Sequence, residues 1–125
     1  KLASGMQIDR ARMLVALNRR DEAVAALADA RSADPANVQA WLLSATLSRR
    51  LERLGEAQQQ IQYAATLNPR DPAIGLEAGV IAAMAGRDAD ARRSFASVID
   101  VAPDSTEAAS AHKYLDQLGS GTSAQ

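Results

Sequence analysis

Cysteine is absent from this chain of 125 residues, and histidine occurs once, as His112. Without cysteine, the chain cannot form disulfide bonds, use a thiol as a catalytic nucleophile or bind a metal through sulfur. A single imidazole also removes most histidine-based metal sites and catalytic triads. We therefore expect His112 to be a surface or interfacial side chain and expect the protein to hold no metal.

An excess of positive charge is missing as well, because 14 Lys and Arg face 15 Asp and Glu, for a net charge of -1. Nucleic-acid-binding domains usually carry a basic excess, so we expect no nucleic-acid partner. No apolar run approaches the length of about 18 residues that spans a bilayer, which argues against direct membrane insertion within this fragment. Since the chain begins with Lys1 and not Met, we expect a cut or processed piece whose upstream signal or anchor is not visible.

Aromatic residues are scarce: the chain has one Trp, two Tyr and one Phe. Alanine dominates instead, and it is the best helix former and lets helices approach closely. Few β-branched or aromatic residues remain to build strands. The composition therefore predicts an all-α fold, and the length suits one compact domain.

A repeat of 34 residues organises the sequence. Pro35, Pro69 and Pro103 stand 34 residues apart. Other positions keep their residue type in the same phase: Ala11, Ala45 and Gly79 are small; Ala23, Ala57 and Ala91 are identical; Leu27, Ile61 and Phe95 are bulky; Ala30, Ala64 and Val98 are small or medium. Small residues allow paired helices to lie close together, and the bulky ones fill the space between one pair and the next. A pair alone cannot bury its apolar faces, so the pairs must stack.

This 34-residue pattern resembles that of the tetratricopeptide repeat (TPR) family, whose repeats are antiparallel helix pairs. The match is best over residues 72–105, which supply Gly79, Gly86, Ala91, Phe95 and Pro103. The resemblance implies a right-handed α-solenoid of seven helices, with repeats at 4–37, 38–71 and 72–105. It also implies a C-terminal capping helix over 105–118, an N-terminal tail over 1–3 and a flexible tail over 119–125.

Helix ends can be placed from local signals. Asp71 before Pro72 predicts an N-cap followed by proline at the first helical position, and Asp104 and Ser4 are predicted N-caps of two other helices. Asn18 and Gly86 tolerate the left-handed conformation that ends a helix. Glu52 takes the equivalent place in the middle repeat, so we expect about 1 kcal/mol of strain, or a reshaped turn that Gly55 shares.

Catalytic and cofactor motifs are not found. The sequence has no glycine-rich phosphate loop, nucleophile elbow or zinc-protease motif. Asp88 and Asp90 have the spacing of calcium ligands, but the glycine and distal glutamate of a calcium loop are missing. We therefore predict a protein without enzymatic activity or cofactor.

The family resemblance implies that the first helix of each pair lines a concave groove that holds a peptide of a partner protein. Carried over by position, the groove residues are Ile8, Arg12, Gln39, Leu42, Leu43, Thr46, Arg49, Arg50, Leu76, Val80, Ala83, Met84 and Tyr114. One subgroup of the family holds C-terminal carboxylates through paired lysines and asparagines. Because Ile8 and Arg12 stand at the first of these places, we do not expect that ligand class. Apolar residues with nearby arginines instead predict a peptide with one or two apolar anchors and a carboxylate.

Two alternatives stay open. Self-association as a homodimer could use an outer apolar face that includes Met6, Met13, Leu14 and Leu17. The repeats could also be the docking module of a larger protein that carries a membrane anchor or a catalytic domain. A composition rich in Ala and Arg but poor in Lys suggests a bacterial source with a GC-rich genome. The absence of cysteine is compatible with a location of the protein in either the cytoplasm or the periplasm.

Overall fold

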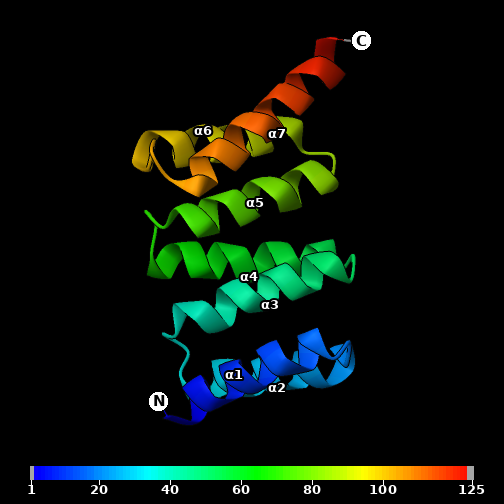
Figure 1. Ribbon diagram of the computed structural model, residues 1–125, viewed down its shortest axis with the longest axis vertical. Helices are drawn as coiled ribbons and strands as arrows, with labels where there is room; N and C mark the ends of the chain where they lie inside the picture. Colours follow the sequence, from blue (N-terminus) through cyan, green and yellow to red (C-terminus); the bar gives the residue numbers. More distant parts are fainter. Residues whose placement is uncertain (1, 124–125) are drawn as a thin grey trace. The chain divides into compact units, whose positions relative to one another are not determined.

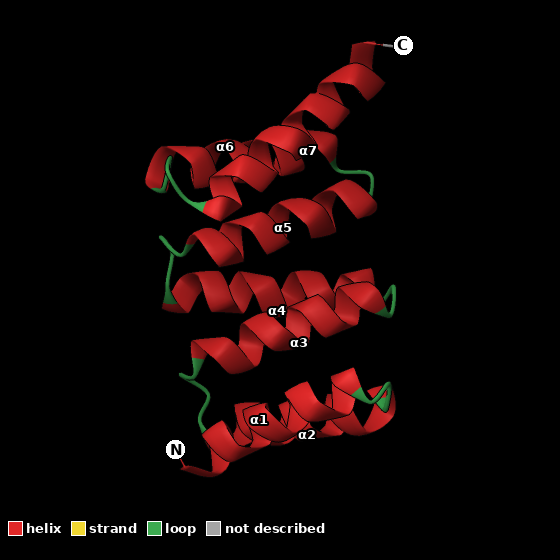
Figure 2. Ribbon diagram, viewed as in Figure 1, coloured by secondary structure: helices red, strands yellow, loops and turns green. Residues whose placement is uncertain are grey.

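The computed structural model describes residues 2–123, and within that range it contains seven α-helices and no strand (Figure 2). In chain order the helices are α1 (Leu2–Ala16), α2 (Arg20–Ala33), α3 (Val38–Arg50), α4 (Leu54–Leu67), α5 (Pro72–Met84), α6 (Asp88–Val101) and α7 (Thr106–Ser123). None of these helices combines the length and the low polarity needed to cross a membrane. The chain divides into two compact units, residues 1–67 and 68–125, and each is described by itself.

The first unit contains two helix pairs, α1 with α2 and α3 with α4, joined by contacts between α2 and α3 (Figure 1). Alanines at the pair contacts, such as Ala11 and Ala23, are fully buried and let the helices lie close together. Leu27 of α2 packs in the same core cluster as Leu47 of α3. The apolar core therefore continues from the first pair into the second, as the repeat predicted.

The second unit contains the pair α5 and α6, with α7 packed against both. Phe95 of α6 is completely buried, and its ring stacks on Tyr114 of α7 with the ring centroids 5.2 Å apart. Gly79 of α5 faces the same ring, at a distance that leaves no space for a Cβ atom. α7 therefore covers the bulky residue that α6 presents, which is the expected role of a capping helix.

The three turns inside the pairs share one backbone conformation. Asn18, Glu52 and Gly86 have φ angles of 60°, 61° and 79°. In each turn the next residue's N–H donates to a carbonyl five residues earlier, as in the 2.8 Å bond from Arg53 to Ser48. Glu52 thus adopts the strained left-handed conformation, and the alternative, a turn reshaped around Gly55, is wrong because Gly55 lies inside α4.

Two predicted N-caps are corrected. Asp71 caps α5 as predicted, since its carboxylate accepts the N–H of Ala73 at 2.9 Å. At α7 the cap is Ser105, not Asp104, because the Ser105 hydroxyl accepts the N–H of Ala108 at 3.0 Å. Ser4 is no cap, because α1 begins at Leu2 and places Ser4 within the helix.

The ends of the chain also differ from the prediction. α1 includes residues 2 and 3, which were expected to form a tail. α7 continues beyond Gly119 to Ser123, where a flexible tail was expected. Glycine costs a helix about 1 kcal/mol but does not terminate it, and no proline follows. The remaining residues of the two predicted tails, 1 and 124–125, lie outside the described part of the chain.

Candidate functional site

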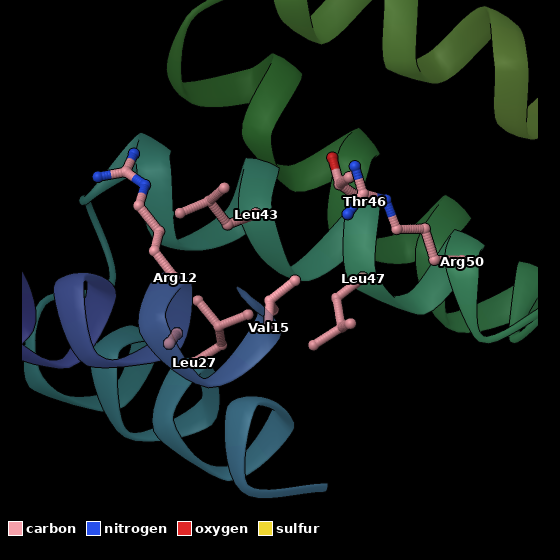
Figure 3. Close-up of a pocket in the computed structure, with 8 residues that line it drawn as sticks. Arg12, Val15, Leu27, Leu43, Thr46, Leu47 and Arg50 are labelled. Carbon is pink, nitrogen blue, oxygen red and sulfur yellow. The ribbon is translucent and has the colours of Figure 1, made fainter. Parts of the chain in front are cut away.

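A pocket of about 200 Å³ lies in the first unit between α1, α2 and α3 (Figure 3). It forms because α1 and α3 both pack on α2 and barely contact one another. Eight residues line it: Ala11, Arg12, Val15, Leu27, Leu43, Thr46, Leu47 and Arg50.

The floor of the pocket is apolar. Leu27 and Leu47 are buried, and Val15 and Leu43 are half-buried between them and solvent. Such a surface favours an apolar group, because contact with these side chains removes that group from water. The volume is below the several hundred cubic ångströms typical of sites for cofactors or drug-sized molecules. The pocket therefore suits one or two aliphatic side chains.

Two arginines stand on opposite sides of this floor. Figure 3 shows the Arg12 guanidinium, from α1, on one side and the Arg50 guanidinium, from α3, on the other, with Leu43, Val15 and Leu47 between them. Arg12 is exposed and lies 3.8 Å from the Asp9 carboxylate, a long surface pair of small energetic value. Arg50 is also exposed and has no ion-pair or hydrogen-bond partner among the described side chains. Both guanidinium groups can therefore donate hydrogen bonds to a carboxylate at the edge of the pocket.

Four of the predicted groove residues meet in this pocket: Arg12, Leu43, Thr46 and Arg50. Ile8 does not, because it is 5% exposed and packs in the core with Ala30 and Ala40. The other predicted residues of α3 lie outside the pocket lining: Gln39, Leu42 and Arg49.

The five remaining predicted groove residues belong to the second unit. Leu76, Val80 and Ala83 are half-buried and pack against the core of that unit. Met84 is 48% exposed, and Tyr114 is 36% exposed while it stacks on the buried ring of α6. Their role as contacts for a peptide stays a prediction.

A polar cluster around Arg31 was not predicted. The Arg31 guanidinium lies 5.3 Å from the centroid of the Trp41 ring and donates to the Ser44 hydroxyl. The Trp41 ring also lies 4.2 Å from that of Tyr63, centroid to centroid. Burial lowers the pKa of Arg31, and the nearby Glu56 carboxylate opposes that shift. An arginine pKa starts so high that Arg31 keeps its charge, and the cluster serves to hold α2, α3 and α4 together.

Several residues of the pocket were missed as functional residues. Ala11 and Leu27 were assigned to packing, and Val15 and Leu47 were given no role. Helical spacing in the sequence could have identified two of them. Val15 lies three residues after Arg12, and Leu47 lies four residues after Leu43, so the members of each pair share one helix face. No group of three or more His, Asp or Glu that could hold a metal is found within residues 2–123.

Comparison with known proteins identifies the fold. The sequence matches no protein-family model and no curated protein. Solved structures do match: the first TPR domain of Spaghetti (RPAP3) bound to the HSP90 peptide SRMEEVD has a TM-score of 0.90 and 17% identity, covering 98% of this chain and 94% of that one. The second TPR domain of human RPAP3, in complex with the HSP70 peptide SGPTIEEVD, has a TM-score of 0.85 and 17% identity, covering 94% of this chain and 96% of that one.

The type III secretion translocator chaperone SycD of Yersinia enterocolitica, described as an alternative dimer, has a TM-score of 0.89 and 10% identity, covering 98% of this chain and 96% of that one. At such low identities these likenesses establish the fold alone. The chain has the fold of a TPR solenoid, which confirms the prediction of helix pairs followed by a capping helix.

Proposed function

We propose that the protein is a non-enzymatic interaction module that binds an extended peptide segment of a partner protein in the pocket between α1 and α3. The observation that carries this proposal is an apolar floor flanked by two exposed arginines. The peptide inserts an aliphatic side chain between Val15 and Leu43 and places a carboxylate against Arg12, Arg50 or both.

The chemistry of the pocket supports this ligand class. A buried leucine or isoleucine gains about 1.5–3 kcal/mol from the apolar contact. A guanidinium forms two parallel hydrogen bonds with a carboxylate, which adds affinity and fixes the orientation of the peptide. Ordering a flexible peptide opposes binding, so we expect a micromolar dissociation constant, or about -8 kcal/mol.

Two of the similar structures contain acidic peptides, which supports a peptide as the ligand of this fold. The details of recognition should differ here, however. Ile8 stands where a lysine of the carboxylate-binding subgroup is expected, and its side chain is buried in the core. The carboxylate of our proposed ligand therefore pairs with Arg12, Arg50 or both, and it is either a side-chain or a C-terminal carboxylate.

An array of synthetic hexapeptides tests the proposal. Each peptide carries Leu, Ile, Met, Phe or Ser at a central position, next to Asp or Lys, and ends in a free carboxylate or an amide. We expect the wild-type protein to retain peptides with an aliphatic residue next to Asp. The variant Arg12→Glu/Arg50→Glu should lose these peptides and favour those with Lys, since the charge around the pocket is reversed.

The matched control is Arg20→Glu, a charge reversal at the first residue of α2, which is exposed and lies outside the pocket lining. We expect it to keep the wild-type preference. Arg49 is not suitable for this test, because it is half-buried, has an interaction of its own and lies outside the pocket lining. The proposal is wrong if no aliphatic peptide is retained, or if the Arg12→Glu/Arg50→Glu variant keeps the wild-type preference while its circular dichroism is unchanged.

A further inference from the structure

One face of α1, extended by Leu17 directly after the helix, exposes three large apolar side chains. Met6, Met13 and Leu17 are 71%, 61% and 63% exposed, and their spacing places them on the same side of the helix. Arg10 lies on this side too and is exposed. Leu14, which was predicted to share this surface, is 5% exposed and packs inside the first unit. We call Met6, Arg10, Met13 and Leu17 the α1 outer face.

The repeat shows what these positions do in the next pair. Residues 34 positions later are Ala40, Ser44 and Leu47 on α3 and Leu51, which directly follows α3. The first three are buried and Leu51 is half-buried, because α3 packs against α2 through this side. The α1 outer face is therefore equivalent to the surface through which α3 packs against α2. Within residues 2–123 no helix of the first unit covers the α1 outer face.

The surface of α2 that packs on α3 indicates which kind of helix surface would pack on the α1 outer face. Alanines form most of it: Ala26 lies in the cluster of Leu47, and Ala30 lies in that of Ala40. Leu27 adds one bulky side chain to the same cluster as Leu47. An amphipathic helix with small residues and a leucine on one side has this shape.

Charge distinguishes the α1 outer face from its counterpart on α3. The Ser44 hydroxyl accepts a hydrogen bond from Arg31 of α2. At the equivalent position α1 carries Arg10, so a helix that approaches in the same way must place an acidic residue where α2 has Arg31.

We propose that the α1 outer face docks an amphipathic helix of another protein, with the small-residue and leucine pattern of α2 and an acidic side chain opposite Arg10. A second copy of this chain fits less well. Pairing two α1 helices about a two-fold axis between positions 10 and 13 brings the two Arg10 side chains within a turn of each other. The exposed side of α7 is mostly polar, with His112, Lys113 and Gln117. Its one large exposed apolar side chain among the described residues, Tyr114, is already stacked on Phe95, so little apolar surface is left for the methionines.

Two fluorescent peptides test this inference. Both have the sequence of residues 19–34 with Ala25→Lys, and a lactam between the amine introduced at position 25 and the Asp29 carboxylate, at two exposed positions, maintains the helix. One of the two peptides also carries Arg31→Glu. We expect the peptide with Arg31→Glu to bind the full chain about five- to tenfold more tightly than the unchanged peptide in fluorescence polarisation at low salt. Arg10→Glu in the protein should reverse this preference.

The protein variant Met13→Asp should abolish binding of both peptides, since it places a carboxylate in the apolar contact. Ala96→Asp, which adds the same charge at an exposed position of α6, is its control and should bind as the wild type does. Circular dichroism of each peptide and protein establishes that it is helical. The inference is overturned if neither helical peptide binds, or if Met13→Asp leaves binding unchanged. It is also overturned if sedimentation shows a wild-type dimer that Met13→Asp dissociates, because the occupant is then a second copy.

Discussion

Replacing Gly79 by alanine tests the closest packing in the second unit. A Cβ atom at this position would lie 2.6 Å from Cδ1 and 2.7 Å from Cζ of Phe95, and closer still to Cε1. Real Cβ atoms do not approach other carbons this closely, so the ring or the α5 backbone must move. Phe95 is completely buried and stacks on Tyr114, which leaves the ring little freedom to adjust.

Two opposing effects determine how much Gly79→Ala changes the free energy of unfolding. Alanine favours a helix interior over glycine by about 1 kcal/mol. Inserting a methyl group into a well-packed core costs about 1–3 kcal/mol. We therefore expect Gly79→Ala to lower the free energy of unfolding by up to about 2 kcal/mol. Gly119→Ala is the matched control, because among the described residues no atom beyond its chain neighbours and the adjacent helix backbone lies within 4 Å of its added Cβ, and it should raise stability by up to about 1 kcal/mol.

A double variant identifies the clash as the cause. Where the second unit pairs Gly79 with Phe95, the first unit has Ala11 and Leu27 at the equivalent positions, both in one core cluster. Combining Gly79→Ala with Phe95→Leu should therefore cost about 1–2 kcal/mol less than the sum of the two single changes. Urea denaturation followed by far-ultraviolet circular dichroism measures all four proteins. The reasoning fails if Gly79→Ala stabilises the protein as Gly119→Ala does, or if the effects of Gly79→Ala and Phe95→Leu are additive.

Two further changes test the first unit, where Trp41 is the sole tryptophan and its fluorescence reports unfolding. Glu52→Gly should raise the free energy of unfolding by about 1 kcal/mol, since φ is 61° and glycine adopts this conformation without strain; an unchanged urea midpoint would contradict this. Ser4→Ala should lower it by about 1–3 kcal/mol, because the buried Ser4 hydroxyl donates to the Ala30 carbonyl at 2.9 Å and accepts from Asn37 at 3.0 Å. The exposed Ser32→Ala is the control for Ser4→Ala, and equal midpoints for the two variants would show that the buried hydrogen bonds contribute little.

The turns and helix pairs were predictable from the sequence because they depend on neighbouring residues. A residue that tolerates the left-handed conformation after a helix is a local signal, and the 34-residue repeat places Asn18, Glu52 and Gly86 at equivalent turns. Ser4 shows where this reasoning ends. Its hydroxyl resembles an N-cap in sequence, but its partner is a carbonyl 26 residues away, which no local pattern indicates.

Only part of the pocket lining could be predicted by assigning residues from their position in the repeat. The resemblance assigned Arg12 and Leu43 to the groove, and both line the pocket, while their contact with a peptide stays a prediction. One position along a helix rotates a side chain by about 100°, however, so an assignment by family position is sensitive to small shifts. Ile8 illustrates this sensitivity, since it points into the core. The cation–π contact between Arg31 and Trp41 joins two helices, and nothing within either helix predicts it.

One position that lines the pocket differs in all three repeats, while the position before it stays small. Ala11, Ala45 and Gly79 stay small in all three repeats, because a packing contact between paired helices requires it. The next position changes from Arg12 to Thr46 to Val80, and Arg12 and Thr46 both line the pocket. A change that the fold tolerates at this position alters the charge that a peptide meets. Under the proposed function we therefore expect recognition to depend on positions at which the repeats depart from one another, and exchanging Arg12 and Thr46 should change ligand preference more than stability.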